Sequence, residues 1–166
     1  SSAHMTRFLS LRLMLPAAIL CGVLTLSSPA PAAAALAATS STSASDTESA
    51  AFGICKSGGG ADCVVDGDTI WYRGSKIRIA DIDTPEISRP GCPQEAALGR
   101  QATERLRQLL NAGRFGLALP PDGRSKDRYG RELRIVTRNG QSLGAVLVRE
   151  GLAARWGGPK RAWCRG

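Results

Sequence analysis

Histidine is almost missing from this 166-residue chain, because His4 is the only one. Residues 1–4 precede Met5 and have the character of a cloning remnant, so the domain itself is left without histidine. That absence excludes every mechanism that needs an imidazole as base, acid or metal ligand. No Cys-x-x-Cys pair occurs either, which argues against a zinc site. The length has room for one domain with a single core.

Charge is also absent from a long stretch, between Arg12 and Asp46. A basic start, an apolar run over 13–26 and a small-x-small pair ending at Ala35 together have the three regions of an export signal. We predict such a signal over residues 5–35. Removing it takes away two arginines and no acid, so the remaining chain stays cationic, which favours polyanions as partners.

An uncleaved membrane anchor is the alternative to a cleaved signal. Pro16, and the change after Leu26 from Leu-rich to Ser, Pro and Ala, favour the short apolar region of a signal. Residues 36–51 are rich in Ser, Thr and Ala without periodicity and are expected to form a disordered linker before a domain over 52–166. We therefore expect a secreted or periplasmic monomer with no stable membrane association after cleavage.

Four cysteines remain once Cys21 leaves with the signal: Cys55, Cys63, Cys92 and Cys164. An even set in an exported chain predicts two disulfides. Three connectivities are open. We favour Cys55–Cys63, because three glycines between them let the chain fold back, and Cys92–Cys164, which would anchor the C-terminal tail to the start of the main helix.

Hydrophobic periodicity predicts strands and two helices in one order along the chain. The expected strands cover Val64–Val65, Thr69–Tyr72, Lys76–Asp83, Phe115–Leu119 and Leu133–Thr137, and the expected helices cover Pro93–Asn111 and Leu143–Glu150. This order is typical of an α+β fold, a small β-barrel with helices packed on it.

Turn and cap residues support the two helices. Pro93 suits the first turn of the main helix, and Gly113 is expected to end it in a left-handed conformation. Gly99 inside that helix is a weak point, costing about 1 kcal/mol relative to alanine. Ser142 can cap the second helix, and Gly151 would end it.

Six of the 14 acidic residues fall within 25 positions: Asp62, Asp66, Asp68, Asp81, Asp83 and Glu86. Such a cluster repels itself unless a cation lies among the carboxylates. Ligation by oxygen alone, without His or Cys, indicates a hard ion, calcium or magnesium. The simpler interpretation is that Asp66-Gly67-Asp68 is only a turn and that the other acids are surface charges.

Two arginines add to this pattern. Arg78 stands in a strand that otherwise alternates Ile and Ala, where a guanidinium needs an anionic partner or a ligand. Arg131 follows Gly130, which would let the backbone turn so that the side chain points into a cleft; taken alone, a solvated loop arginine is the simpler interpretation. In a regular strand Arg78 and Asp83 would face opposite sides. Either the strand bulges or it ends before Asp83, and the following Thr-Pro pair favours the second.

Four stretches in this order resemble the staphylococcal-nuclease (thermonuclease) family over about Cys63 to Ala153. They are Val65–Ile70 (VDGDTI), Ile77–Ile79 with Asp83–Glu86 (IRI and DTPE), Asp127–Arg131 (DRYGR) and Leu147–Ala153 (LVREGLA). The resemblance implies an OB-type five-stranded barrel with helices. It also implies calcium-dependent hydrolysis of DNA and RNA phosphodiesters.

The resemblance assigns roles by position. Asp68 and Asp83 match the calcium carboxylates, Thr84 the backbone-carbonyl ligand, Glu86 the residue that orients or deprotonates the attacking water, and Arg78 and Arg131 the two that bind the scissile phosphate. Arg128 and Tyr129 beside them are expected to contact the substrate. Family members carry nucleotide-contacting tyrosines near the position of Trp156, which would either stack on a base or lie buried under the tail.

The chain departs from the family after Ala153, where better-known members continue into a further helix and this sequence has only about a dozen residues. We expect the Cys92–Cys164 bridge to compensate by anchoring the tail. The alternative to an enzyme is a catalytically silent OB-type module that binds nucleic acid or other polyanions. The presence of all six site residues favours the enzyme.

Overall fold

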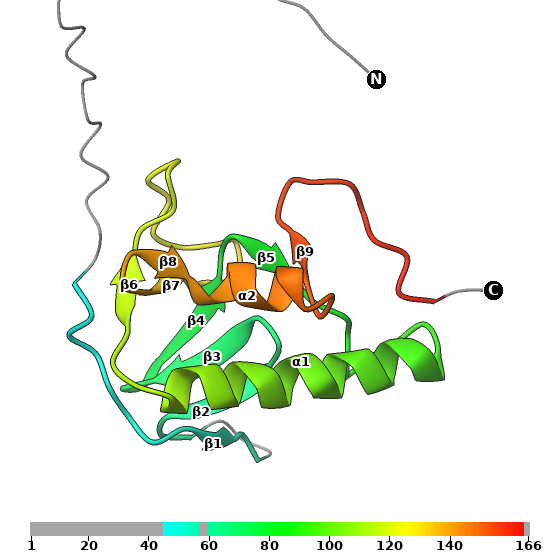
Figure 1. Cartoon of the computed structure of the whole chain (residues 1–166), viewed down its shortest axis with the longest axis horizontal. Helices are drawn as coiled ribbons and strands as arrows, with labels where there is room; N and C mark the ends of the chain where they lie inside the picture. Colours follow the sequence, from blue (N-terminus) through cyan, green and yellow to red (C-terminus); the bar gives the residue numbers. More distant parts are fainter. Residues whose placement is uncertain (1–44, 57–59, 165–166) are drawn as a thin grey trace, which may run out of the picture. The chain divides into compact units, whose positions relative to one another are not determined.

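The computed structural model describes residues 45–56 and 60–164 (Figure 1). The predicted export signal and most of the predicted linker lie outside this part. None of the helices described there has the length and hydropathy needed to cross a membrane.

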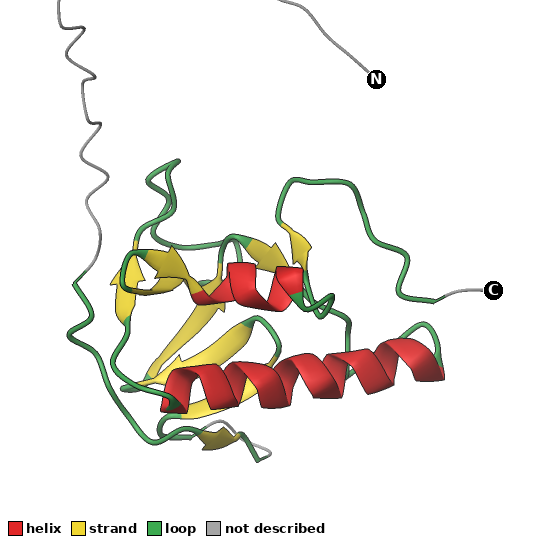
Figure 2. Cartoon of the chain, in the orientation of Figure 1, coloured by secondary structure: helices red, strands yellow, loops and turns green. Residues whose placement is uncertain are grey.

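Two helices and nine strands make up the described part (Figure 2). Their bounds are β1 Gly53–Ile54, β2 Cys63–Asp66, β3 Thr69–Tyr72, β4 Ser75–Ile79, β5 Ile82–Asp83, α1 Pro93–Asn111, β6 Gly116–Ala118, β7 Glu132–Arg138, β8 Gln141–Ser142, α2 Leu143–Arg149 and β9 Ala154–Arg155. This confirms the predicted α+β class with one long and one short helix.

The main sheet has the strand order β1-β2-β3-β4-β7-β6, with β8 paired to β7, and β5 and β9 form a separate two-stranded sheet. The β1–β2 and β4–β7 pairs are parallel, whereas β2–β3, β3–β4, β6–β7 and β5–β9 are antiparallel. Five of these strands, β2, β3, β4, β6 and β7, are those expected from the sequence; the short β1, β8 and β9 were missed. A strand of two residues is too short to show the alternation by which a strand is recognised, so their own sequence does not reveal them.

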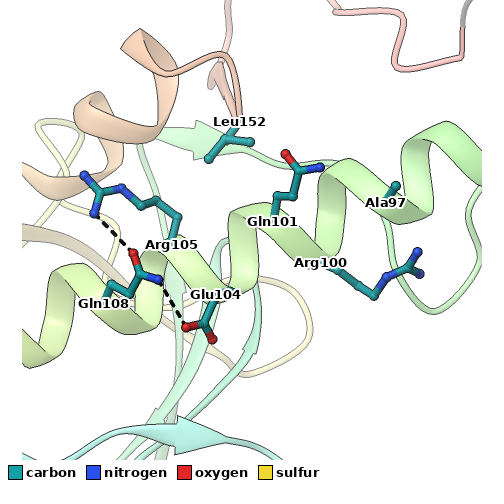
Figure 3. Close-up of a pocket in the computed structure, with 7 residues that line it drawn as sticks. All are labelled: Ala97, Arg100, Gln101, Glu104, Arg105, Gln108 and Leu152. Atoms are coloured by element: carbon teal, nitrogen blue, oxygen red, sulfur yellow. Dashed lines mark hydrogen bonds between the residues drawn. The ribbon is translucent and has the colours of Figure 1, made fainter.

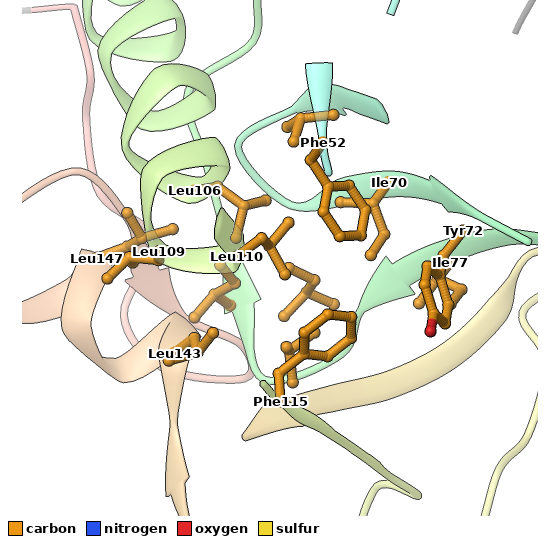
Figure 4. Packing of buried hydrophobic residues seen from close by; sticks show 14 of the residues in the cluster. Phe52, Ile70, Tyr72, Ile77, Leu106, Leu109, Leu110, Phe115, Leu143 and Leu147 are labelled. Atoms are coloured by element: carbon orange, nitrogen blue, oxygen red, sulfur yellow. The ribbon is translucent and has the colours of Figure 1, made fainter. Parts of the chain in front are cut away.

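Aromatic and aliphatic side chains from both helices and the sheet meet in one core (Figure 4). The rings of Phe52, Tyr72 and Phe115 lie with centroids 5.4 to 5.9 Å apart. Leu106 and Leu110 of α1 and Leu147 of α2 bury their side chains against the strands. The helical spacing that predicted α1 thus corresponds to the face that it buries.

The folded unit begins earlier than predicted. Glu48 exchanges both backbone hydrogen bonds with Phe115, at 2.9 and 3.0 Å, and its carboxylate accepts a 2.6 Å hydrogen bond from the Tyr72 hydroxyl. The Asn111 side chain binds both backbone groups of Phe52. Residues 45–51 are therefore part of the domain, and extending the linker through Ala51 was wrong, since composition alone does not show a pairing with a segment almost 70 residues away.

Both predicted disulfides are present. Cys55 pairs with Cys63, and Cys92 pairs with Cys164, so the tail is joined covalently to the start of α1. Cys92 is also the N-cap of α1, where its sulfur accepts a hydrogen bond from the Glu95 amide at 3.4 Å.

The helix ends follow most of the predicted signals. Ser142 caps α2 by accepting a 3.0 Å hydrogen bond from the Ala145 amide, and Gly151 beyond its end has φ 78°. α1 ends at Asn111 as predicted, but the expected left-handed Gly113 is wrong. Its φ of 158° is nearly extended, because the Ala112 amide already bonds to the Leu109 carbonyl and closes the helix without a left-handed residue.

Candidate active site

The strand predicted over Lys76–Asp83 is broken in two, which corrects the sequence-based assignment. β4 ends at Ile79, and β5 begins at Ile82 after a turn. The guanidinium of Arg78 holds this bend: its Nη1 donates to the carbonyls of Ile79 and Ile82, the second at 2.9 Å. Asp83 then lies on β5, paired with Ala154 of β9, so the regular alternation between Arg78 and Asp83 does not apply.

Arg78 has the anionic partners that its position in a strand requires. Its Nη2 lies 3.2 Å from Asp68 Oδ2 and 3.5 Å from Asp83 Oδ1. The Arg78 and Asp68 side chains are buried, whereas that of Asp83 is 55% exposed. Removing one partner of such a buried ion pair typically costs about 3–5 kcal/mol, so this contact fixes the centre of the site.

Asp68 accepts hydrogen bonds on both carboxylate oxygens. Oδ2 accepts from the amide of Thr84 at 3.1 Å and from its hydroxyl at 3.0 Å, and Oδ1 accepts from the Thr69 hydroxyl at 3.0 Å. The preceding turn is closely packed, because a Cβ on Gly67 would lie 2.7 Å from Ala102 Cβ and 2.8 Å from Thr84 Cγ2. Glycine here lets the Asp-Gly-Asp turn reach both α1 and the Thr84 segment.

The carboxylates of this cluster oppose one another electrostatically. Burial, followed by the charge of Asp68, raises the pKa of Asp66 to about 6. Burial and Asp68 also raise the pKa of Asp83, against the lowering effect of Arg78. Arg78 contacts two of these three carboxylates, and a bound cation would offset the excess negative charge.

The donor set fits a hard cation, although the ligands are few. The described residues include no group of three or more His, Cys, Asp or Glu side chains arranged around one metal position. Asp68 and Asp83 provide carboxylate oxygens within 3.5 Å of the same Arg78 nitrogen, and Thr84 follows Asp83 directly. Oxygen-only donors of this kind suit calcium, which accepts irregular coordination and completes it with water.

A small pocket of about 70 Å³ joins Arg78 to the second predicted arginine, Arg131. Trp156, Arg124 and Asp127 also contribute to its wall. Arg78 therefore both contacts the carboxylates and lines this pocket. Three arginines around one pocket are well suited to bind a phosphate group.

Asp127 positions Arg131, a role that the sequence analysis missed. Its Oδ2 accepts from Arg131 Nε at 2.7 Å, and its Oδ1 accepts from the amides of Tyr129 and Arg131 at 2.9 and 3.0 Å. Burial raises the pKa of Asp127, but these hydrogen bonds outweigh it and leave the pKa lowered. Gly130 has φ 80°, the left-handed conformation that this turn requires. The available signal was an aspartate followed two residues later by a turn amide, the pattern of an Asx-turn.

The neighbouring aromatic residues are exposed. Tyr129 is 67% exposed, with the guanidinium of Arg128 4.7 Å above its ring and that of Arg131 at 5.6 Å. Trp156 is 59% exposed and lies 5.4 Å from the Arg78 guanidinium. Burial of Trp156 under the tail, one of two alternatives from the sequence, is therefore wrong.

Glu86, the predicted base, does not line the pocket of Arg78 and Arg131, and within residues 45–56 and 60–164 its side chain makes no hydrogen bond or ion pair to the other predicted site residues. It is exposed on the segment between β5 and α1, and its amide donates to Glu95 at 3.4 Å. Gly99 of α1 lies directly under this segment: a Cβ there would be 2.7 Å from the Pro85 carbonyl oxygen and 3.2 Å from that of Glu86. Gly99 is therefore not simply a weak point of α1, because its close approach determines where the Glu86 segment lies.

A wider hollow lies along the outer face of α1 (Figure 3). Polar side chains that line it hydrogen-bond to one another: Gln108 accepts from Arg105 at 3.4 Å and donates to Glu104 at 3.2 Å. Arg105 is paired in turn with Glu150. No buried polar group points into this hollow from the residues that line it, so we do not assign it a function.

The fold and the site together define a small α+β domain in which a pocket lined by arginines lies beside a cluster of carboxylates. A family model described as Staphylococcal nuclease homologue matches residues 76–160, and the chain belongs to this family. The match includes every predicted site residue except Asp68, which precedes it. Membership confirms the resemblance and the fold that it implied.

Three curated relatives place the chain more closely within the family. It is 39% identical over 97 residues to endonuclease YncB of Bacillus subtilis (strain 168), covering 55% of this chain and 44% of the relative. It is 40% identical to the SPbeta prophage-derived endonuclease YokF of the same organism, over 55% of this chain and 32% of the relative. The thermonuclease of Staphylococcus hyicus is 33% identical over 54% of each chain. The matches thus span about half the length of these relatives or less.

Proposed function

We propose that this protein is an exported, calcium-dependent nuclease that hydrolyses phosphodiester bonds of DNA and RNA and acts as a monomer. The observation that carries the proposal is the position of Arg78, which contacts Asp68 and Asp83 and lines one pocket with Arg131. Such an arrangement suits a phosphodiester bound between guanidiniums on one side and a cation site on the other. Relatives named endonuclease and thermonuclease support it.

Asp68, Asp83 and the carbonyl of Thr84 would hold the calcium ion. When bound, the ion supplies a positive charge that stabilises the negative charge developing on the phosphoryl oxygens. The charge balance supports this assignment, because burial and the charge of Asp68 raise the pKa of both Asp66 and Asp83, and a bound cation would favour their ionised forms.

The chain's own residues bind and orient the phosphodiester. Arg78 and Arg131 donate to its non-bridging oxygens, and these bonds strengthen as charge develops during in-line attack. Asp68 and Asp127 hold the two guanidiniums in advance, so little side-chain entropy is lost on binding. Glu86 takes a proton from the attacking water, since the domain has no histidine for this role.

Export is supported by the sequence and by the disulfides. Two bridges in a domain of this size are typical of oxidising compartments, and residues 5–35 have the pattern of an export signal. We place the protein in the periplasm or outside the cell.

The test is hydrolysis of single- and double-stranded DNA and of RNA with calcium, with magnesium and with a chelator. We expect turnover only with calcium, and Glu86→Gln to lower it by about a hundredfold or more. Glu104→Gln, an exposed carboxylate on α1 that pairs with Arg107, is the matched control and should keep full turnover.

Full activity in a chelator would refute the metal requirement, and equal turnover with magnesium would refute calcium as the specific ion. Wild-type turnover in Glu86→Gln would remove this residue from the mechanism. Nucleic-acid binding without cleavage under every condition would instead support the catalytically silent OB-type module.

A further inference from the structure

A second cationic surface lies beside the pocket, on the C-terminal segment. It consists of Arg155, Lys160 and Arg161, which we call the tail rim. The sequence has no acidic residue after Glu150. Within residues 45–56 and 60–164, no ion pair involves any of the three, whereas Arg78 and Arg131 both have carboxylate partners. The tail rim therefore has no ion-paired carboxylate in this part of the chain, and the nearest acidic influence is Asp83, whose pKa Lys160 helps to lower.

The segment that carries the tail rim is held at both ends. At one end β9 pairs with β5, and the Trp156 amide donates to the Asp81 carbonyl at 2.9 Å. At the other end the Cys92–Cys164 bridge joins it to α1. Between these points the segment arches away from β9 (Figure 1). The cations thus belong to a fixed arch and not to a loose chain end, which reduces the entropy lost when they bind a ligand.

A hollow of about 300 Å³ connects the tail rim to the active site. Asp83, Trp156 and Lys160 all contribute to its lining, and Arg155 borders it as well. Gly157 in its wall has φ 74°, and a Cβ there would meet nothing within 4 Å, so this side of the hollow is open. Trp156 also lines the pocket of Arg78 and Arg131 and therefore stands between the two sites.

We propose that the tail rim binds the backbone of single-stranded nucleic acid next to the scissile phosphate, with Trp156 stacking on the base between the two phosphate sites. The proposal rests on the proposed function, because that function places the scissile phosphate between Arg78 and Arg131. Cationic grooves interrupted by exposed aromatic rings are the usual means of binding single strands, with stacking worth about 1–3 kcal/mol per base.

The exposed ring of Trp156 favours single-stranded nucleic acid over other polyanions as the ligand of the tail rim. Its ring is 59% exposed, so a flat partner has access to it, and bases of a duplex are not free to stack there. A sulfated polysaccharide would use the cations and not the ring. The observations therefore favour single-stranded DNA or RNA.

The first experiment measures binding without catalysis. Anisotropy of a fluorescent 16-residue oligothymidylate is followed in chelator at several salt concentrations for the wild type and for Arg155→Ala/Lys160→Ala. Each phosphate contact on a single strand contributes about 0.7 to the slope of log affinity against log salt. Losing two contacts should lower the slope by about 1.4.

A matched control removes the same charge elsewhere. Lys56 and Arg100 are exposed, border neither the hollow nor the pocket, and lie in no ion pair of the described chain, so Lys56→Ala/Arg100→Ala should keep the wild-type slope. Trp156→Ala should weaken binding at every salt concentration without changing the slope, because stacking releases no counterions. An unchanged slope in Arg155→Ala/Lys160→Ala, or an equal loss in the control, would overturn the proposal. So would weakened binding of heparin with unaltered oligonucleotide binding.

The second experiment separates this proposal from the proposed function. With calcium, kcat/KM is compared for the 16-residue oligonucleotide and for a dinucleotide, which is too short to reach the tail rim. Arg155→Ala/Lys160→Ala should lower the ratio of the two values, and an unaltered ratio would refute the tail rim as a substrate site. If the wild type cleaves neither substrate, the proposed function fails, and the anisotropy series alone decides whether the tail rim binds single strands.

Discussion

Gly99→Ala should destabilise this protein, although the same change normally stabilises a helix. Replacing glycine by alanine inside an exposed helix gains about 1 kcal/mol of stability. At Gly99 the new Cβ would lie 2.5 Å from Ile87 Cγ2 and 2.7 Å from the Pro85 carbonyl oxygen. Neither atom moves easily, since Ile87 is β-branched with few rotamers and the carbonyl belongs to the backbone.

The magnitude follows from these two opposing effects. Inserting a methyl group into a packed contact typically costs about 1–3 kcal/mol. Over most of that range the cost is larger than the gain of about 1 kcal/mol in helix propensity. We expect Gly99→Ala to lower the free energy of unfolding by about 1 kcal/mol. We also expect turnover to fall by more than stability alone would explain, because the displaced backbone carries Glu86, and a shift of about 1 Å at a catalytic group can cost a hundredfold.

Urea unfolding and nuclease turnover of Gly99→Ala would be measured beside Gln101→Ala and Gln101→Gly. Gln101 is exposed two residues further along α1, so the difference between its two variants reports helix propensity without packing. The reasoning is refuted if Gly99→Ala is more stable than the wild type by about the Gln101 difference and has full turnover. That result would mean that the Glu86 segment moves away without cost.

Three further predictions concern the disulfides, the second arginine and the N-terminal segment. Replacing both cysteines of the Cys92–Cys164 bridge by serine keeps an N-cap acceptor for α1 and should lower the free energy of unfolding in urea by about 4 kcal/mol. The same change at the Cys55–Cys63 bridge should cost about 2.5 kcal/mol, because its cysteines are 8 residues apart in sequence and not 72. Equal losses would contradict this loop-entropy account. Arg131→Lys should lower turnover about a hundredfold, since lysine keeps the charge but loses the planar fork; wild-type turnover would make Arg131 a solvated loop residue. The hydrogen bond from Tyr72 lowers the pKa of Glu48, so Glu48→Gln should be less stable than the wild type at pH 7. The difference in stability should shrink as pH falls below about 4.5 and through the lowered pKa. A stability difference that does not vary with pH would refute this prediction.

The parts of the fold that the sequence predicted are those determined by local physics. The bounds of α1 follow from an apolar face at helical spacing and from Pro93 in its first turn. The bounds of α2 follow from Ser142, which caps its start, and from Gly151, which has φ 78° beyond its end. Each signal lies within a few residues of the structure that it specifies.

The parts that were missed depend on contacts between distant segments. β4 and β5 alternate as one strand in sequence, and only the hydrogen bonds of Arg78 to two carbonyls after it show why the chain bends there. β9 exists because it pairs with β5, and the segment around Glu48 is ordered because it pairs with Phe115. For the site, the motifs predicted which residues take part. They did not show that Arg78 would join Asp68 and Asp83 to the pocket that it lines with Arg131.

The proposed site is built mainly from turns, loops and very short strands, so its precision has to come from single contacts outside regular secondary structure. Arg78 fixes the bend before Asp83, Asp127 fixes the loop that carries Arg131, and the Cys92–Cys164 bridge fixes the tail beyond Trp156. The first two contacts lie within the irregular segments that they hold, and the bridge ties the tail to the start of α1. Loss of one should therefore displace one group while the core of α1 and the main sheet persists, because that core shares few side chains with the site. Activity in this domain is expected to be more sensitive than stability to changes at Asp127, and this difference distinguishes a residue that positions Arg131 from one that merely holds the fold together.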